Sequence, residues 1–206
     1  MRLPPLYAIV DPLDTGRDPV ALAAAFLEGG ARLLQLRLKH ATPRELLAAA
    51  AAICPLVHAA GALFLVNDRP DVARAVAADG VHLGQDDVPV AAARRVLGPG
   101  ALIGVSTHDL DEARAGEADG ADYLGIGPVY ETTSKTRPLA PRGLELVRAA
   151  RATVRLPLVA IGGITAATAS AVRAAGADAV AMIAALVRAP DPAAAVREAL
   201  AALDRR

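Results

Sequence analysis

The sequence alternates short runs of strand-forming residues with alanine-rich helical stretches, and no other feature constrains the fold as much. The eight strand candidates are Leu6–Val10, Leu33–Arg37, Leu63–Val66, Gly80–Leu83, Leu102–Val105, Tyr123–Ile126, Leu158–Ile161 and Ala179–Ile183. Strands that alternate with helices form βαβ units and a parallel sheet. Eight such units within 206 residues predict the α/β class and a single domain, residues 1–206, folded as a closed (β/α)8 TIM barrel.

The alternative fold is an open, doubly wound sheet. That architecture uses fewer strands and places a glycine-rich turn after the first one. Here the first strand candidate is followed by Asp11-Pro-Leu-Asp14, which is not a turn of that kind. The closed barrel is therefore favoured.

Local signals predict where the helices begin and end. A side chain that can cap a helix, followed by Pro at the first helical position, marks a helix start. Such starts occur at Asp18-Pro19, in the capping box Thr42-Pro-Arg-Glu45 and at Asp191-Pro192. Glycine just after a helix favours the left-handed conformation that ends it. We therefore expect helices to stop at Gly30, Gly80, Gly120 and Gly176.

Composition excludes several classes of function. The 22 Lys and Arg residues balance 22 Asp and Glu residues, so the basic excess of a nucleic-acid-binding protein is missing. Aromatic residues make up 2% and Trp is absent, which argues against stacking on single-stranded nucleic acid. The single cysteine, Cys54, suits a reducing compartment, so a cytoplasmic location is expected.

The stretch from Leu46 to Val66 has no charged residue and resembles a membrane span. However, Pro55 and Gly61 divide it in the manner of a helix, a turn and a strand. A buried helix followed by a buried strand explains the same residues, so no membrane association is expected.

In a barrel of this kind the chemistry lies where strands end and the following loops begin. The second strand candidate ends in Gln35, Arg37 and Lys39, which are spaced to share one face of an extended chain. Polar groups on a buried strand are costly unless they find partners. The pattern indicates a clamp for an anion, and the alternative is a salt bridge inside the barrel mouth.

Carboxylates follow the third and fourth strand candidates, in Asn67-Asp68 and in Asp86-Asp87. Neighbouring strands that both end in carboxylates suggest a shared cation, and Mg²⁺ takes one or two protein carboxylates together with substrate phosphate oxygens. Both segments are also good helix starts, so capping is the alternative role. Together, and beside the cationic second strand, they favour the metal.

Three later strand ends carry weaker signals. After the fifth strand, Ser106 is a candidate ligand hydrogen bonder, and His108 is a candidate cap of the next helix. After the sixth, the loop Thr132-Thr-Ser-Lys135 combines hydroxyls with an ammonium group, as a phosphate grip does. After the seventh, Gly162-Gly163 allows close backbone approach to a ligand, or simply a tight turn.

Taken together, these segments resemble the thiamine-phosphate synthase family in order and spacing. The matching segments are Leu6-Tyr-Ala-Ile-Val10, Gln35-Leu-Arg-Leu-Lys39, Asn67-Asp-Arg69, His82-Leu-Gly-Gln-Asp-Asp87, Gly104-Val-Ser-Thr-His108, Gly125-Ile-Gly-Pro-Val-Tyr130 with Lys135, and Ala160-Ile-Gly-Gly-Ile164. The resemblance implies a barrel enzyme that condenses hydroxymethylpyrimidine diphosphate with hydroxyethylthiazole phosphate. The implied products are thiamine phosphate and diphosphate, so the implied partners are small molecules.

The resemblance also implies roles for individual residues. The diphosphate would be held by Arg37, Lys39, Asn67 and Lys135, of which Arg37, Lys39 and Lys135 would be catalytic. Mg²⁺ would bind Asp68 and Asp87, the second carboxylate of its pair. The pyrimidine would contact Gln35 and Ser106, and the thiazole phosphate would contact Thr132, Ser134, Gly163, Ile183 and Ala184. Ala184 stands where the family often has Ser, which removes one possible hydroxyl donor to the phosphate.

Two other functions remain open at this point. A thiazole tautomerase would need an acid/base, for which His108 is the candidate, but would need neither a diphosphate cage nor a metal pair. A non-catalytic barrel that binds a phosphate ligand is the other, since fold alone does not determine function. The retained charged residues favour the synthase. The sequence leaves open whether the chain forms a homo-oligomer.

Overall fold

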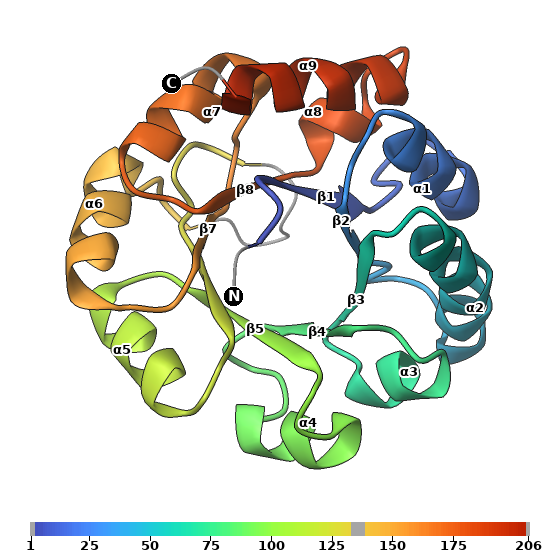
Figure 1. Ribbon diagram of the computed structural model, residues 1–206, viewed down its shortest axis with the longest axis horizontal. Coiled ribbons are helices and arrows are strands. Elements are labelled where there is room, and N and C mark those ends of the chain that lie inside the picture. Colours follow the sequence, from blue (N-terminus) through green and yellow to red (C-terminus); the bar gives the residue numbers. More distant parts are fainter. Residues whose placement is uncertain (1–2, 133–138, 205–206) are drawn as a thin grey trace.

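The computed structural model describes residues 3–132 and 139–204, which form a closed barrel of eight parallel strands. Strands follow one another around the barrel in sequence order, and helices surround them (Figure 1). The strands are β1 (Leu6–Val10), β2 (Leu33–Leu36), β3 (Leu63–Asn67), β4 (Gly80–Leu83), β5 (Leu102–Thr107), β6 (Tyr123–Ile126), β7 (Leu158–Ala160) and β8 (Ala179–Met182). The predicted barrel is confirmed.

In the described part of the chain, one helix follows each of the first seven strands, and two follow β8. These helices are α1 (Pro19–Glu28), α2 (Pro43–Ala59), α3 (Pro70–Ala75), α4 (Val90–Leu97), α5 (Leu110–Ala118), α6 (Gly143–Thr153), α7 (Ala166–Ala174), α8 (Ala184–Val187) and α9 (Pro192–Asp204). Asp18 and Thr42 cap α1 and α2 as predicted, and the Asp191 carboxylate accepts the Ala194 N–H at the start of α9.

Three of the four predicted glycine stops are confirmed. Gly30, Gly120 and Gly176 follow α1, α5 and α7 with φ values of 99°, 83° and 111°. Gly80 is different, because it is the first residue of β4 rather than the end of a helix. A Cβ atom at Gly80 would lie 1.9 Å from the Leu102 carbonyl oxygen, so a close strand approach explains this glycine.

The stretch that resembled a membrane span forms a helix, a turn and a strand, as expected. Helix α2 continues through Pro55 to Ala59, so Pro55 does not end it, and Gly61 makes the turn with a φ of 64°. In the described part of the chain, every helix is too short or too polar to cross a bilayer.

The strands are buried on both faces, which explains their nearly continuous apolar composition. Alternate residues point inward to a small cluster that includes Tyr7, Leu65, Tyr123 and Val159. Their neighbours point outward and pack against the helices in a larger cluster.

Three aspartates hold the edge of the barrel at which the strands begin, and we call them the carboxylate clamps. Each stands just before β4, β6 or β8 and accepts a backbone N–H of the preceding strand. Each also contacts a basic side chain of the helix that comes before that preceding strand. The clamps are Asp79 with the Phe64 N–H and His58, Asp122 with the Ile103 N–H and Arg94, and Asp178 with the Leu158 N–H and Arg151. Each clamp therefore links the starts of two neighbouring strands to a helix.

We predict that Asp122→Ala lowers the free energy of unfolding by about 1–3 kcal/mol, because a partly buried N–H and a guanidinium lose a charged acceptor. The Asp122 carboxylate lies 2.7 Å from the Ile103 nitrogen and 2.6 Å from Arg94. Asp111→Ala is the control, since Asp111 is 94% exposed and pairs only at the surface with Arg114. Its effect in urea unfolding should stay below about 1 kcal/mol. Equal losses in the two variants would contradict the assignment.

Candidate active site

A cavity of about 1000 Å³ opens where the strands end. Most of the residues predicted from the sequence to bind substrates line it. Those that do are Gln35, Arg37, Asn67, Ser106, Thr132, Gly163, Ile183 and Ala184. The predictions for Ser134 and Lys135 lie outside the described residues. Barrel closure therefore brings side chains from distant parts of the sequence to one cavity.

Arg37 forms an ion pair with Asp11, so the salt-bridge alternative describes its contact in the structure. Asp11 directly follows β1, and β1 pairs with β2, which Arg37 directly follows. The two side chains are only 10% and 13% exposed, and Asp11 also accepts the Leu13 N–H at 3.0 Å. Sequence reasoning missed Asp11, although it is a carboxylate at a strand end like those after β3 and β4.

Lys39 does not share a strand face with Gln35 and Arg37 as the spacing predicted. Strand β2 ends at Leu36, and Lys39 lies in the turn that follows. Its ammonium group contacts the Asp68 carboxylate. A candidate diphosphate ligand and a candidate metal ligand are thus directly paired.

The Asp68 and Asp87 carboxylates lie close together beside the cavity. Burial and the neighbouring Asp68 raise the pKa of Asp87, while Lys39 acts in the opposite direction. The Asp87 side chain also accepts the Gly84 N–H at 2.7 Å. Two adjacent carboxylates repel each other, so this arrangement favours a cation between them.

The alternative role of these aspartates as helix caps is wrong. Helices α3 and α4 begin after Arg69 and Pro89, and at both starts the described residues provide no capping side chain. Among the described residues there is no cluster of three or more His, Cys, Asp or Glu side chains placed for a metal. The pair still fits Mg²⁺, which needs only one or two carboxylates when a substrate supplies further oxygens.

A chain of buried hydrogen bonds, which we call the relay, links Gln35 to Ser106. It runs from β2 through β1, β6 and β4 to β5. Its members are Gln35, Tyr7, Tyr123, His82 and Ser106, with successive contacts of 2.7, 3.0, 2.9 and 2.9 Å. Burial raises the pKa of both Tyr7 and Tyr123 above the usual value, so both phenols are neutral. Sequence reasoning identified the two ends of the relay and missed the middle, because inward-facing Tyr and His fit an ordinary strand pattern.

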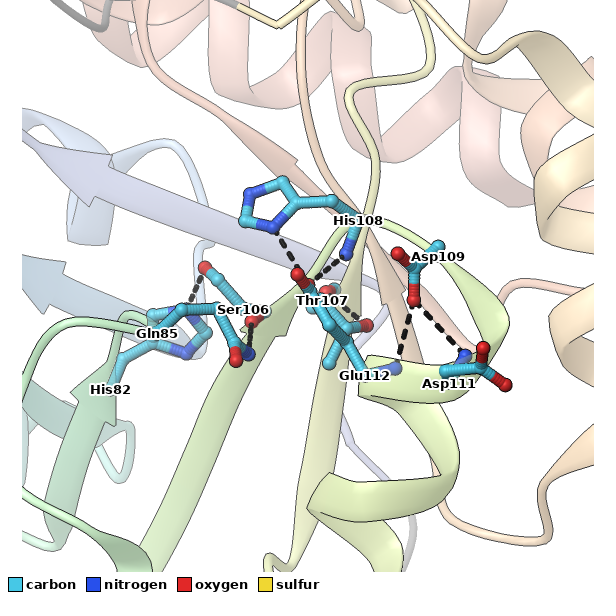
Figure 2. A network of polar contacts seen from close by, with 9 residues as sticks. His82, Gln85, Ser106, Thr107, His108, Asp109, Asp111 and Glu112 are labelled. Carbon is cyan, nitrogen blue, oxygen red and sulfur yellow. Dashed lines mark hydrogen bonds and ion pairs between the residues drawn. The ribbon is translucent and has the colours of Figure 1, made fainter.

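Figure 2 shows how the end of β5 holds Ser106 and His108. Asp109, not His108, caps α5, because its carboxylate accepts the N–H groups of Asp111 and Glu112. His108 instead contacts the Glu112 carboxylate through its backbone N–H at 2.7 Å and through Nδ1 at 2.9 Å. His108 also lines the cavity.

The Gly162-Gly163 turn after β7 packs against the loop after β6. Both glycines have positive φ, 94° and 64°. The Gly162 carbonyl accepts the Tyr130 N–H at 3.1 Å, and a Cβ atom at Gly163 would lie 2.2 Å from the Glu131 carbonyl oxygen. Glycine at this turn therefore lets the two loops that border the cavity approach each other.

The sequence and the fold of the chain can be compared with those of known proteins. The family model for thiamine monophosphate synthase matches residues 6–186. The chain belongs to this family. It is 50% identical to the thiamine-phosphate synthase of Chloroflexus aurantiacus, an alignment that covers 94% of this chain and 89% of the relative. With the thiamine-phosphate synthase of Chlorobium luteolum the identity is 46%, over 97% and 93% of the two chains.

A solved structure gives the same result. The thiamine phosphate pyrophosphorylase from Pyrococcus furiosus superimposes with a TM-score of 0.89 and 38% identity, over 97% of this chain and 95% of that one. The resemblance drawn from the strand-end motifs is confirmed. The chain is thus an enzyme of the transferase class that belongs to thiamine biosynthesis.

We predict that Gly163→Ala destabilises the protein more than Gly61→Ala does. The two glycines have the same φ of 64°, but a Cβ atom at Gly61 meets nothing within 4 Å. Both variants lose about 1–2 kcal/mol to left-handed strain, and Gly163→Ala should lose about 1–3 kcal/mol more through the clash with Glu131. Urea unfolding of the pair measures the difference. If the variants unfold alike, the two loops do not pack as described.

Proposed function

We propose that this chain condenses hydroxymethylpyrimidine diphosphate with hydroxyethylthiazole phosphate to give thiamine phosphate and diphosphate. The observation that carries the proposal is family membership over nearly the whole chain, together with paired cations and carboxylates beside the cavity. The free Cys54 and the small substrates support a cytoplasmic location.

The diphosphate end of the first substrate is assigned to Arg37, Lys39, Asn67 and Lys135. Arg37 and Asn67 line the cavity, and Lys39 lies at the carboxylate pair. Asp11 is the partner that orients Arg37. A fixed guanidinium is suited to leaving-group stabilisation because it needs no reorganisation as negative charge develops.

Asp68 and Asp87 would hold Mg²⁺ at the same end. Magnesium bound there would neutralise charge on the departing diphosphate. The contact between Lys39 and Asp68 keeps a cation and a carboxylate within reach of the same phosphate oxygens. The Gly84 N–H donates to one oxygen of the Asp87 carboxylate and so helps to orient this proposed ligand.

The thiazole phosphate is assigned to Thr132, Ser134 and the backbone near Gly163, Ile183 and Ala184. Thr132, Gly163, Ile183 and Ala184 line the cavity, and Ser134 lies outside the described residues. Loops after the seventh and eighth strands form the usual phosphate site of this fold. The chain offers backbone N–H groups there, since Ala184 carries no hydroxyl.

The reaction requires no general base. The attacking thiazole nitrogen carries no proton, and an electron-rich aminopyrimidine can spread the positive charge left on its methylene as diphosphate departs. The chain's own task is to align the nitrogen with that carbon and to exclude competing water. Gln35 and Ser106 are the residues we assign to the pyrimidine ring.

We predict that chelation abolishes turnover and that Asp87→Ala lowers kcat by at least about 10²-fold, the scale of losing one charge-stabilising group. Asp86→Ala is the matched control. Asp86 is exposed, whereas Asp87 is partly buried at the carboxylate pair. Thermal unfolding with each variant separates a folding defect from a catalytic one. Full activity in excess EDTA would refute the metal, and equal losses at both positions would refute the choice of carboxylate.

We predict that His108→Asn keeps a substantial part of the coupling activity. In a synthase no proton leaves carbon, so His108 serves structure or ligand positioning, as its contacts with Glu112 suggest. In a tautomerase the same change would remove the acid/base and cost about 10²–10⁴-fold. The measurement compares coupling rate and thiazole proton exchange in wild type and variant. Exchange without coupling in wild type, lost in His108→Asn, would overturn the proposed function.

A further inference from the structure

The relay has one direction that satisfies its hydrogens. In the described part of the chain, the Tyr7 hydroxyl meets the Gln35 amide nitrogen at 2.7 Å and the Tyr123 hydroxyl at 3.0 Å. An amide N–H can only donate, so the Tyr7 oxygen accepts from Gln35. The Tyr7 proton then goes to the Tyr123 oxygen.

The same argument continues to the far end. Since Tyr123 accepts from Tyr7, its own proton goes to His82 Nδ1 at 2.9 Å. A neutral imidazole that accepts at Nδ1 carries its proton on Nε2. His82 Nε2–H therefore donates to Ser106 Oγ at 2.9 Å, which leaves the Ser106 hydroxyl proton for a ligand in the cavity that Ser106 lines.

We infer that the three middle members of the relay, Tyr7, Tyr123 and His82, are positioning residues; this inference rests on the proposed function. They make Gln35 a hydrogen-bond acceptor and Ser106 a hydrogen-bond donor toward the pyrimidine. Gln35 uses its amide nitrogen within the relay, so its carbonyl oxygen remains for the cavity. Without a relay, Gln and Ser side chains can each donate or accept. Here, reversing the direction of any one hydrogen bond requires reversing every hydrogen bond of the relay and rotating the Gln35 amide.

This pattern selects an aminopyrimidine over its oxo analogue. An exocyclic amino group donates to the Gln35 oxygen, and the ring nitrogen across from it accepts from Ser106. When the amino group is replaced by oxygen, a carbonyl acceptor stands where the amino donor stood, and the new ring N–H lies on the nitrogen beside that carbonyl. The Gln35 oxygen then faces a second acceptor instead of a donor, and a buried mismatch of this kind is a strong basis for rejecting a substrate.

The first test is spectroscopic and needs no substrate. Long-range ¹H–¹⁵N correlation spectra of the histidine-labelled full chain report the tautomer of each imidazole, and His82→Gln assigns the signal. We expect neutral His82 with its proton on Nε2 in wild type and a mixture of tautomers in Tyr123→Phe. A proton on Nδ1 in the wild type would show that the relay runs the other way and would overturn the inference.

The second test measures discrimination. The ratio of the inhibition constant of the oxo-pyrimidine diphosphate to the KM of the amino substrate is compared among variants. We expect Tyr123→Phe to lower this ratio about tenfold, the scale of one hydrogen bond, and Tyr130→Phe, the same change outside the relay, to leave it unchanged. A merely structural role would alter stability but not the ratio. An unchanged ratio in folded Tyr123→Phe overturns the inference.

Two outcomes are kept separate by this design. If the wild type does not turn over the amino substrate, the proposed function fails, while the His82 tautomer still decides the relay. If Tyr123→Phe does not fold, Tyr7→Phe replaces it, since it cuts the relay but keeps the contact between Tyr123 and His82. The inference then requires the ratio to fall in Tyr7→Phe, and an unchanged ratio refutes it.

Discussion

Pairing of β1 with β8 closes the sheet, and the rest of the structure depends on this closure. In a closed parallel barrel all strands end at one rim, so Gln35 and Ser106 face one cavity although they are far apart in sequence. The opposite rim carries the clamps Asp79, Asp122 and Asp178, which tie strand starts to helices. The charges that stabilise the fold and the charges that we assign to the chemistry thus lie at opposite ends of the barrel. The two adjacent carboxylates, Asp68 and Asp87, therefore lie at the end of the barrel away from the clamps that stabilise it.

Nearby carboxylates compensate the positive charges of Arg37 and Lys39 at the cavity end of the barrel. An unpaired guanidinium at 13% exposure would be costly, and Asp11 supplies the compensating charge for Arg37. Lys39 and Asp68 balance each other in the same way, which leaves Asp87 as the carboxylate whose pKa is raised by burial and by Asp68. A site arranged like this is close to neutral by itself. Under the proposed function, it would take up a polyanionic substrate together with a divalent cation without a large change in local charge.

The fold could be predicted because eight strand runs alternate with capped helices, a pattern that few architectures satisfy. Gly80 was interpreted wrongly because a glycine before a strand and a glycine within one look alike in sequence. The contact between backbone and backbone that requires Gly80 is a tertiary fact. Motif resemblance found the family and the ends of the relay. It could not find Asp11 as the partner of Arg37, which depends on the pairing of β1 with β2. Nor could it find the contact between Tyr7 and Tyr123, which joins β1 and β6 across the barrel interior.

Two strand glycines make room for the rings of the relay. A Cβ atom at Gly104 would lie 2.0 Å from the ring of Tyr123, and one at Gly125 would lie 3.2 Å from the ring of His82. Glycine within a strand weakens it, so its presence at inward positions of β5 and β6 has to be offset by something else. The space that these glycines leave is filled by the two rings, stacked with their centroids 5.6 Å apart. A purely apolar filling would pack equally well and would need no matched partners. Burying hydroxyls and an imidazole is costly unless their hydrogens find acceptors. Here the relay provides these partners, and it ends at Gln35 and Ser106, which line the cavity.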